Sequence, residues 1–136
     1  MRRRGLVLAV SVAALFSACG PSGARAEGVP KACHDAIADA ATPLGQVYTV
    51  ISLCQGRTKA AALRETFFTA IDRKGLSPEQ YRDVLAAYYI ALGSTFEAHA
   101  SCDDSALDVA ETALERHFQR IDVMNAACAS PVVPPH

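Results

Sequence analysis

The sequence predicts an all-α protein: an up-down-up-down four-helix bundle with its first helix kinked at Pro43 and two nested disulfides. Apolar residues recur at spacings of three and four from Lys31 to about Cys128, which is the period of an amphipathic helix. No run shows the strict alternation of a half-buried strand. The chain has 136 residues and 51% of them are apolar, which suffices for one domain with its own core but not for two.

The first helix is predicted from about Lys31 to Cys54. Within it, Thr42 and Pro43 supply an N-cap residue and a first-turn proline, so we expect the helix to break or kink there. Gly56 ends the helix at a position that glycine prefers. The inward-facing positions that follow the proline are Leu44, Val47, Tyr48, Ile51 and Cys54.

A stop signal and a start signal separate the second and third helices. Gly75 ends the second helix, which begins at Thr58. Ser77, Pro78 and Gln80 then form a capping box, with a serine cap, a proline in the first position and a glutamine that reaches back. The inward-facing positions are Leu63, Phe67, Ala70, Ile71 and the stem of Lys74 in the second helix, and Tyr81, Val84, Leu85, Tyr88, Leu92, Phe96 and His99 in the third.

The fourth helix is predicted to begin at the cluster of Asp103, Asp104 and Ser105, whose acidic residues suit the positive end of a helix dipole. Its inward-facing positions are Leu107, Ala110, Leu114, Phe118, Ile121, Met124 and Cys128. The loops between the four helices contain only a few residues, so we expect consecutive helices to be antiparallel neighbours.

Residues 1–26 have the form of an export signal peptide, with three arginines followed by a short apolar run. The run is too short to span a bilayer. Cleavage is expected after the A-x-A site that ends at Ala26, leaving a helical bundle over 27–129 and a flexible tail over 130–136. The alternative cleavage site precedes Cys19, which would then be lipidated and would anchor the protein. We therefore expect a periplasmic protein, either soluble or lipid-anchored in the envelope.

The chain that follows the leader is acidic. Four of the 13 basic residues lie before residue 27 and no acidic residue does, which leaves 9 basic against 14 acidic residues and a net charge of −5. A domain of that sign lacks the basic patch that nucleic-acid binding requires. It is also not drawn to an anionic lipid surface by charge alone.

Four cysteines follow the leader, and in an exported domain of this size they imply two disulfides. Cys102 and Cys128 lie at opposite ends of one helix, roughly 36 Å apart at 1.5 Å per residue, so they cannot be bridged. Alternating helix directions place Cys54 near Cys102 at one end of the bundle and Cys33 near Cys128 at the other. The predicted pairs are therefore Cys54–Cys102 and Cys33–Cys128. Because Cys54 and Cys102 fall on apolar faces, the inner bridge is expected to matter more for stability.

The cysteine and histidine pattern does not favour a redox or metal site. No C-x-x-C is present, and the pairs Cys33 with His34 and His99 with Cys102 lie at opposite ends of the predicted bundle, so they cannot share an ion. His99 and His117 border apolar faces and are expected to be packing residues. The alternative is a ligand-binding or pH-sensing role. We expect no metal and no cofactor.

Two apolar residues, Phe68 and Ile90, lie off the inward faces of their helices. They are candidates for an exposed patch that binds a partner, the alternative being apolar residues scattered singly over the surface. The last helix also carries acidic residues on one side. We expect them to form a solvated face, because no apolar pocket is evident that would raise the pKa of a carboxyl group.

Two segments carry a pattern of their own. The first reads LGQVYTVISLC and ends at Cys54, and the second reads VLAAYYIALGSTF and leads to Cys102. Together they resemble an uncharacterised alphaproteobacterial family of small exported helical proteins with two well-separated cysteines, over roughly residues 44–121. The resemblance implies a disulfide between Cys54 and Cys102, whereas Cys33 and Cys128 go beyond the family pattern. It implies no chemistry, because the family has no assigned function.

The sequence shows no nucleophile–base pair, metal-ligand set or phosphate-binding loop. We therefore expect a non-enzymatic periplasmic module that binds another envelope protein. Alternatives within this class are an acid-stress chaperone, which would open as its carboxylates protonate, and an inhibitor or immunity protein that covers the basic cleft of a cell-wall hydrolase. The rival is a small-ligand carrier or hydrolase that uses His99 or His117 in a pocket between helices.

Overall fold

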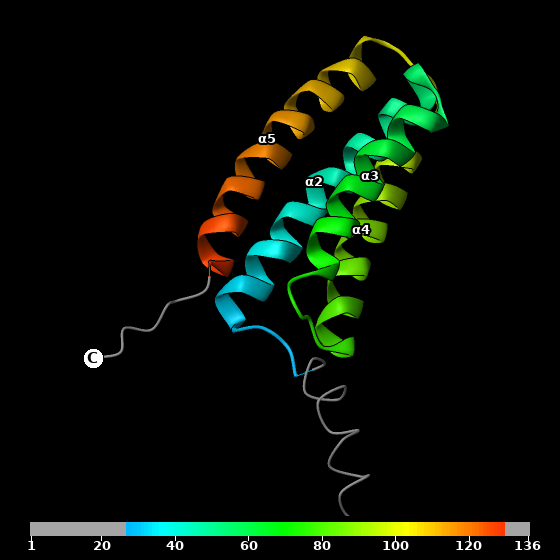
Figure 1. The fold of residues 1–136 in the computed structure, drawn as a ribbon. Coiled ribbons are helices and arrows are strands. Elements are labelled where there is room, and N and C mark those ends of the chain that lie inside the picture. The colour runs from blue at the N-terminus through cyan, green and yellow to red at the C-terminus, as the bar shows by residue number, and fades with distance from the viewer. Residues whose placement is uncertain (1–26, 130–136) are drawn as a thin grey trace, which may run out of the picture.

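Four helices of alternating direction make up the part of the chain that the computed structural model describes, residues 27–129 (Figure 1). They are α2 (Lys31–Gln55), α3 (Arg57–Asp72), α4 (Pro78–Ala98) and α5 (Asp104–Cys128). Of these residues 84% are helical and none is in a strand, which confirms the all-α prediction. No helix within them is long and apolar enough to cross a membrane. The predicted signal peptide over 1–26, including Cys19, and the tail over 130–136 lie outside the described residues.

The central helix is α2. It packs against each of the other three, most extensively against α4 and α5, whereas the backbones of α3, α4 and α5 stay apart from one another. The closest neighbour of α4 is therefore α2, which runs in the same direction, and not a helix that is adjacent in sequence (Figure 1). The short loops set the alternating directions as predicted. They do not decide which helices are in closest contact.

A glycine allows α4 to lie close against α2. Gly45 faces the backbone of α4, and a Cβ atom at this position would overlap the Tyr88 carbonyl and lie 2.9 Å from the Leu92 nitrogen. One turn later, the Thr49 hydroxyl donates a hydrogen bond to the Leu92 carbonyl at 3.0 Å. Only a residue without a side chain permits this approach, so Gly45 is required by the packing.

The helix α2 continues through Pro43, so of the break or kink expected there the break does not occur. Pro43 has no N–H, so the carbonyl of Asp39 loses its helical donor. Side chains add hydrogen bonds to the same turn. The Thr42 hydroxyl donates to the Ala38 carbonyl at 3.3 Å, and a ring nitrogen of His117 lies 2.9 Å from the Ala40 carbonyl. The surrounding contacts thus hold the helix together at its proline.

Tyr88 connects three helices in the core. It is 1% exposed, and its ring centroid lies 6.2 Å from that of Tyr48 on α2 and 5.4 Å from that of Phe68 on α3, both edge-to-face. Such aromatic pairs stabilise a core by about 0.5–1.5 kcal/mol beyond the area they bury. These rings join α3 to α4 where the two backbones do not approach one another.

Two nested disulfides link the helices at the ends of the bundle, as predicted. Cys33 is joined to Cys128 at one end and Cys54 to Cys102 at the other. Cys33 is 1% exposed and belongs to the hydrophobic core, whereas Cys102 is exposed in the loop between α4 and α5. The expectation that the inner bridge joins two apolar faces is therefore wrong. The disulfides indicate an oxidising, non-cytoplasmic compartment.

The helix α5 turns a different face inward from the one that its large apolar residues predict. Leu107 and Phe118, both expected inside, are 46% and 53% exposed. The buried residues are Ala106, Ala113, His117 and Met124. The alanines let α5 approach α2, and the ring of His117 meets a carbonyl of that helix. Close packing and one buried hydrogen bond thus outweigh the hydrophobicity of two large side chains.

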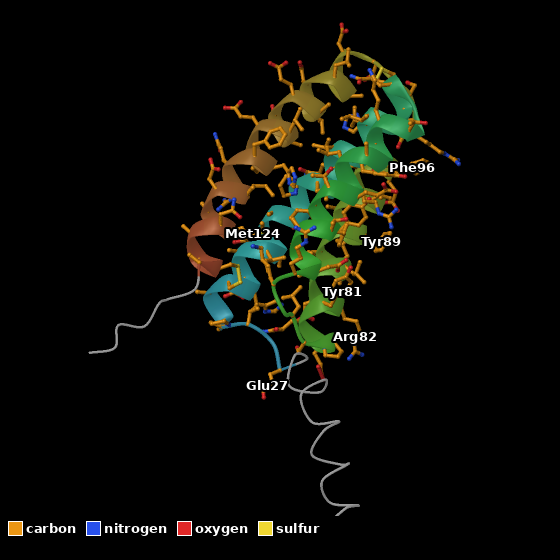
Figure 2. The ribbon with its side chains drawn as sticks, viewed as in Figure 1. Glu27, Tyr81, Arg82, Tyr89, Phe96 and Met124 are labelled. Atoms are coloured by element: carbon orange, nitrogen blue, oxygen red, sulfur yellow. A yellow bond between two sulfur atoms is a disulfide. The ribbon has the colours of Figure 1, made fainter. Side chains whose placement is uncertain are left out.

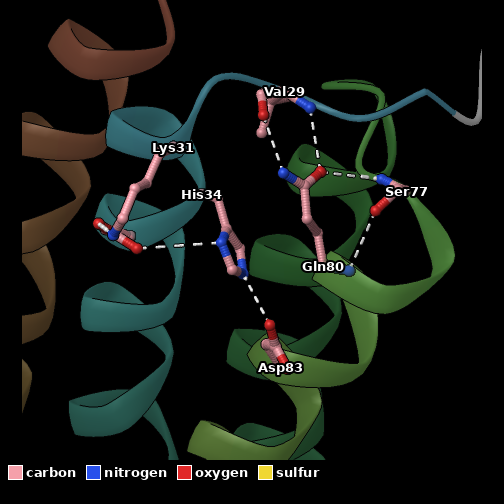
Figure 3. A network of polar contacts seen from close by, with 7 residues as sticks. Val29, Lys31, His34, Ser77, Gln80 and Asp83 are labelled. Atoms are coloured by element: carbon pink, nitrogen blue, oxygen red, sulfur yellow. Dashed lines mark hydrogen bonds and ion pairs between the residues drawn. The ribbon is translucent and has the colours of Figure 1, made fainter.

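The predicted capping box begins α4 and also holds the chain that precedes α2 (Figure 3). The Gln80 N–H donates to the Ser77 hydroxyl at 3.2 Å, and Gln80 Oε1 accepts from the Ser77 N–H at 3.0 Å. The same amide group accepts from the Val29 N–H at 3.0 Å and donates to the Val29 carbonyl at 2.8 Å. Beside it, His34 Nε2 lies 3.4 Å from Asp83 Oδ2. The start of α2 is thus bound to the start of α4.

Candidate functional site

His117 is part of the core and not of a polar site. It is 2% exposed, and its ring centroid lies 5.5 Å from that of Phe67 and 5.7 Å from that of Phe118. Its Nδ1 lies 2.9 Å from the Ala40 carbonyl, which accepts a hydrogen bond only when Nδ1 carries the proton. Burial lowers the pKa of His117 below its ordinary value, and the hydrogen bond to Ala40 opposes this effect only in part. The buried ring is therefore neutral at pH 7.

The neutral state of His117 predicts an acid-sensitive fold. The unfolded chain binds a proton at this residue with a pKa near 6.5, whereas the folded chain does so only at lower pH, so the free energy of unfolding falls as the pH drops below about 6.5. The slope reaches at most about 1.4 kcal/mol per pH unit. Denaturant titrations at pH 7.5 and 5.0 measure the loss. His117→Gln keeps an amide donor but no titrating group, and is expected to lose less stability than the wild type over this range.

An equal loss in the wild type and in His117→Gln would contradict this assignment. The other histidines of the described residues, His34 and His99, remain in both proteins, so the comparison isolates His117.

His99, the other histidine singled out from the sequence, follows the last turn of α4. Its backbone N–H donates to the Thr95 carbonyl at 2.9 Å. The structure does not bring His99 and His117 together, because His117 packs on Phe67 and Ala40 in the middle of the bundle. Among residues 27–129, no group of three or more His, Cys, Asp or Glu side chains is placed to hold a metal ion.

Phe68 and Ile90 lie in different environments. The ring of Phe68 packs against the core, with its centroid 5.4 Å from that of Tyr88 and 6.3 Å from that of Tyr81. Ile90 is 72% exposed. The predicted patch is therefore corrected at Phe68, which fills the space between α3 and α4, and Ile90 alone remains of it.

Ile90 belongs to a larger exposed surface on α4. Tyr89 is 50% exposed and Phe96 is 60% exposed on the same helix. Figure 2 shows Arg82, Tyr89 and Phe96 following one another along α4, on the side of the bundle away from α5. Phe96 was expected inside, but Thr95 takes the inward position because its small side chain fits against α2.

This surface lies opposite the side of α4 that packs on α2. The buried residues of α4 are Val84, Tyr88, Ala91 and Thr95. Positions 82, 86, 89 and 93 each precede one of these by two residues, which corresponds to a rotation of about 200° around the helix. We define the α4 outer face as the surface formed by Arg82, Ala86, Tyr89, Ile90, Gly93, Phe96 and Glu97.

Gly93 lies near the centre of the α4 outer face and has no neighbour. A Cβ atom added there would meet nothing within 4 Å, in contrast to Gly45. A glycine inside a helix destabilises it by about 0.5–1 kcal/mol relative to alanine, and no contact among the described residues requires one here. With the exposed Ala86 two turns earlier, Gly93 leaves two positions of the face without a bulky side chain, where another helix can approach.

Opposite charges flank the apolar middle of the α4 outer face. Arg82 lies in the second turn of α4 and Glu97 in its last turn, and both side chains are exposed. Neither forms an ion pair with another residue in the described range. The apolar middle is thus flanked by Arg82, with the exposed Glu79 one turn before it, and by Glu97 at the other end.

A hollow of about 500 Å³ lies beside the α4 outer face at Phe96. Its walls are largely apolar and aromatic, and they carry a single cation, Arg57. The hydroxyl of Ser52, one of the lining residues, is buried without a hydrogen-bond partner. The full lining is Tyr48, Thr49, Ser52, Leu53, Arg57, Leu92 and Phe96. Such a hollow suits a small ligand with an apolar body and one anionic group.

Apart from Ile90, sequence reasoning missed the α4 outer face. The signal was present, because the run VLAAYYIALGSTF places apolar residues on all sides of the helix. A helix of this kind is expected to be covered on every side. Helical spacing alone did not reveal which of its two apolar sides faces α2.

Comparison of the chain with protein-family models, with curated proteins and with solved structures gave no match. The resemblance to an alphaproteobacterial family therefore gains no support from them.

Proposed function

We propose that the protein is a non-enzymatic helical module of the periplasm that binds another protein through the α4 outer face. The observation that carries the proposal is an apolar surface on which Tyr89, Ile90 and Phe96 are each at least half exposed, opposite the packed side of α4. Aromatic residues are enriched at protein interfaces, because they bury a large area with few rotatable bonds. Polar ends around an apolar centre are also typical of an interface.

The two disulfides support this role. They fix both ends of the bundle, so the α4 outer face is presented on a rigid scaffold and binding requires little ordering of the backbone. They also agree with an exported protein. The periplasm, in soluble or lipid-anchored form, is our proposal from the leader over 1–26.

Ile90→Asp is expected to reduce the capture of the partner by about 10-fold or more, because a carboxylate would be buried without a partner at the centre of the contact. The measurement is a crosslinking pull-down from the native envelope, in which the captured protein is quantified. Phe118→Asp is the matched control, since Phe118 is similarly exposed but lies on α5. Undiminished capture by Ile90→Asp, or an equal loss in both variants, would contradict the proposal.

A second candidate function is the binding of a small amphipathic ligand. The hollow of about 500 Å³ beside Phe96 favours it, with Arg57 as the group that would pair with an anion. The carrier expected from the sequence used His99 or His117, and neither residue lines this hollow. Native mass spectrometry distinguishes the two functions, since only a carrier retains a small molecule that is lost in Arg57→Gln.

A further inference from the structure

We propose that the partner of the α4 outer face is a second copy of this chain, with the two α4 helices packed antiparallel. The inference rests on the proposed function, because it names the partner of the same surface. The order of residues along the face carries it. Arg82 and Ala86 lie as far before the middle of the face as Glu97 and Gly93 lie after it, so a second copy read in the opposite direction brings each of them to its counterpart.

Consider a two-fold axis that passes between Tyr89 and Ile90, at the centre of the face. In an antiparallel pair, every position then faces the position that lies equally far on the other side of the axis, and each contact occurs twice. The facing pairs are Arg82 with Glu97, Ala86 with Gly93, and Tyr89 with Ile90. In this register the charged pair and the small-residue pair each occur twice, and apolar residues lie at the centre. Phe96 falls at the level of Asp83, whose carboxylate lies 3.4 Å from His34 Nε2 on α2.

The two small-residue contacts give the helices room to approach. Packed helices lie 8–10 Å apart, and the side chains at the contact decide where in that range. Inside the bundle, Gly45 brings α2 against the backbone of α4. On the opposite side of α4, Gly93 has open space above it, and a second copy of α4 would fill that space. The cost of a glycine inside the helix is then explained by the dimer.

Charge selects the antiparallel orientation. A parallel pair about a two-fold axis would place Arg82 against Arg82 and Glu97 against Glu97, which are repulsive pairs. The helix dipoles would also point the same way, whereas in the antiparallel pair they oppose one another favourably. Neither charged group has an ion-pair partner among residues 27–129, so both are free to pair across the dimer.

The test is a charge reversal, measured by analytical ultracentrifugation of the full protein with both disulfides formed, at low ionic strength. The wild type is expected to be a reversible dimer. Arg82→Glu and Glu97→Arg each turn two attractive pairs into two repulsive ones, so each is expected to raise the dimer dissociation constant by about 10-fold or more. An equimolar mixture of the two variants restores both pairs and is expected to form a heterodimer. Arg120→Glu, an exposed position on α5, is the control.

Each outcome has a distinct meaning. A wild type that stays monomeric at every concentration overturns self-association, and a mixture that does not associate overturns the antiparallel register. Circular dichroism of each variant confirms that it is folded. The proposed function is judged separately: if the wild type is monomeric but Ile90→Asp still loses capture, the α4 outer face binds a different protein. If Ile90→Asp changes neither the dimer dissociation constant nor the amount of captured protein, the proposed function fails as well.

Discussion

Gly45→Ala is expected to destabilise the protein by about 3 kcal/mol or more, at the upper end of the range for overpacked cores. The added Cβ would overlap a backbone carbonyl, that of Tyr88, and would lie 3.1 Å from the Cβ of Ala91. Backbone atoms cannot turn aside as a flexible side chain does. The substitution therefore has to separate α2 from α4. The contact between these two helices is one of the two most extensive in the bundle.

Thermal unfolding followed by circular dichroism measures this effect. For a domain of about 100 residues, a loss of 3 kcal/mol lowers Tm by about 10–20 °C. Gly93→Ala makes the same chemical change in α4 at a position with no neighbour within 4 Å. In dilute protein it is expected to raise stability by about 0.5–1 kcal/mol. Similar losses of stability in Gly45→Ala and Gly93→Ala would show that the contact between α2 and α4 does not require a glycine at position 45.

Removal of the disulfide between Cys33 and Cys128 is expected to have the second large effect. Each bridge, while the other is intact, closes a ring of about 50 residues and contributes about 4 kcal/mol in the chain-entropy model. Cys33 is also 1% exposed in the core, so its replacement by Ala leaves a gap of about one sulfur atom. We expect Cys33→Ala/Cys128→Ala to lose about 1 kcal/mol more than Cys54→Ala/Cys102→Ala.

Denaturant unfolding of the two double variants checks this ranking. Both remove a pair of thiols, so neither leaves a free cysteine to form a wrong bridge. The environment of Cys102 decides the order, because it lies on an exposed loop where a substitution disturbs little packing. A greater loss in Cys54→Ala/Cys102→Ala would show that the ranking expected from the sequence was correct after all.

The crosslinks were predictable because they depend on coarse geometry. Helix length places Cys102 and Cys128 far apart, and alternating direction leaves one nested pairing, which the structure confirms. The burial of the cysteines was not predictable in this way. It depends on where α4 ends, and Cys102 lies beyond that end although it continues the apolar spacing of the helix.

The inward faces of α4 and α5 were harder to predict, because both helices carry more apolar residues than one face can hold. In α5 the core takes His117 and two alanines, whereas Leu107 and Phe118 remain outside. In α4 it takes Thr95 and leaves Phe96 outside. Close packing against α2 favours small residues at these positions, and that preference depends on tertiary contacts that spacing alone does not contain.

The same limit applies to the candidate site. From the sequence, Ile90 was a candidate for an exposed patch. Tyr89 and Phe96 were not, because Tyr89 adjoins the expected inward face and Phe96 belongs to it. Self-complementarity along α4 becomes visible only when the exposed side is known. Arg82 and Glu97 then lie toward its two ends, with Ala86 and Gly93 as the small residues between them.

The most direct test of the α4 outer face as the binding surface is site-specific photo-crosslinking in living cells, with benzoylphenylalanine in place of Tyr89. We predict an adduct of twice the mass of the chain, linked near Ile90 of the second copy. The same amino acid in place of Phe118 on α5 is predicted to give no protein adduct. A protein adduct from position 118 together with none from position 89 would contradict the assignment of this surface.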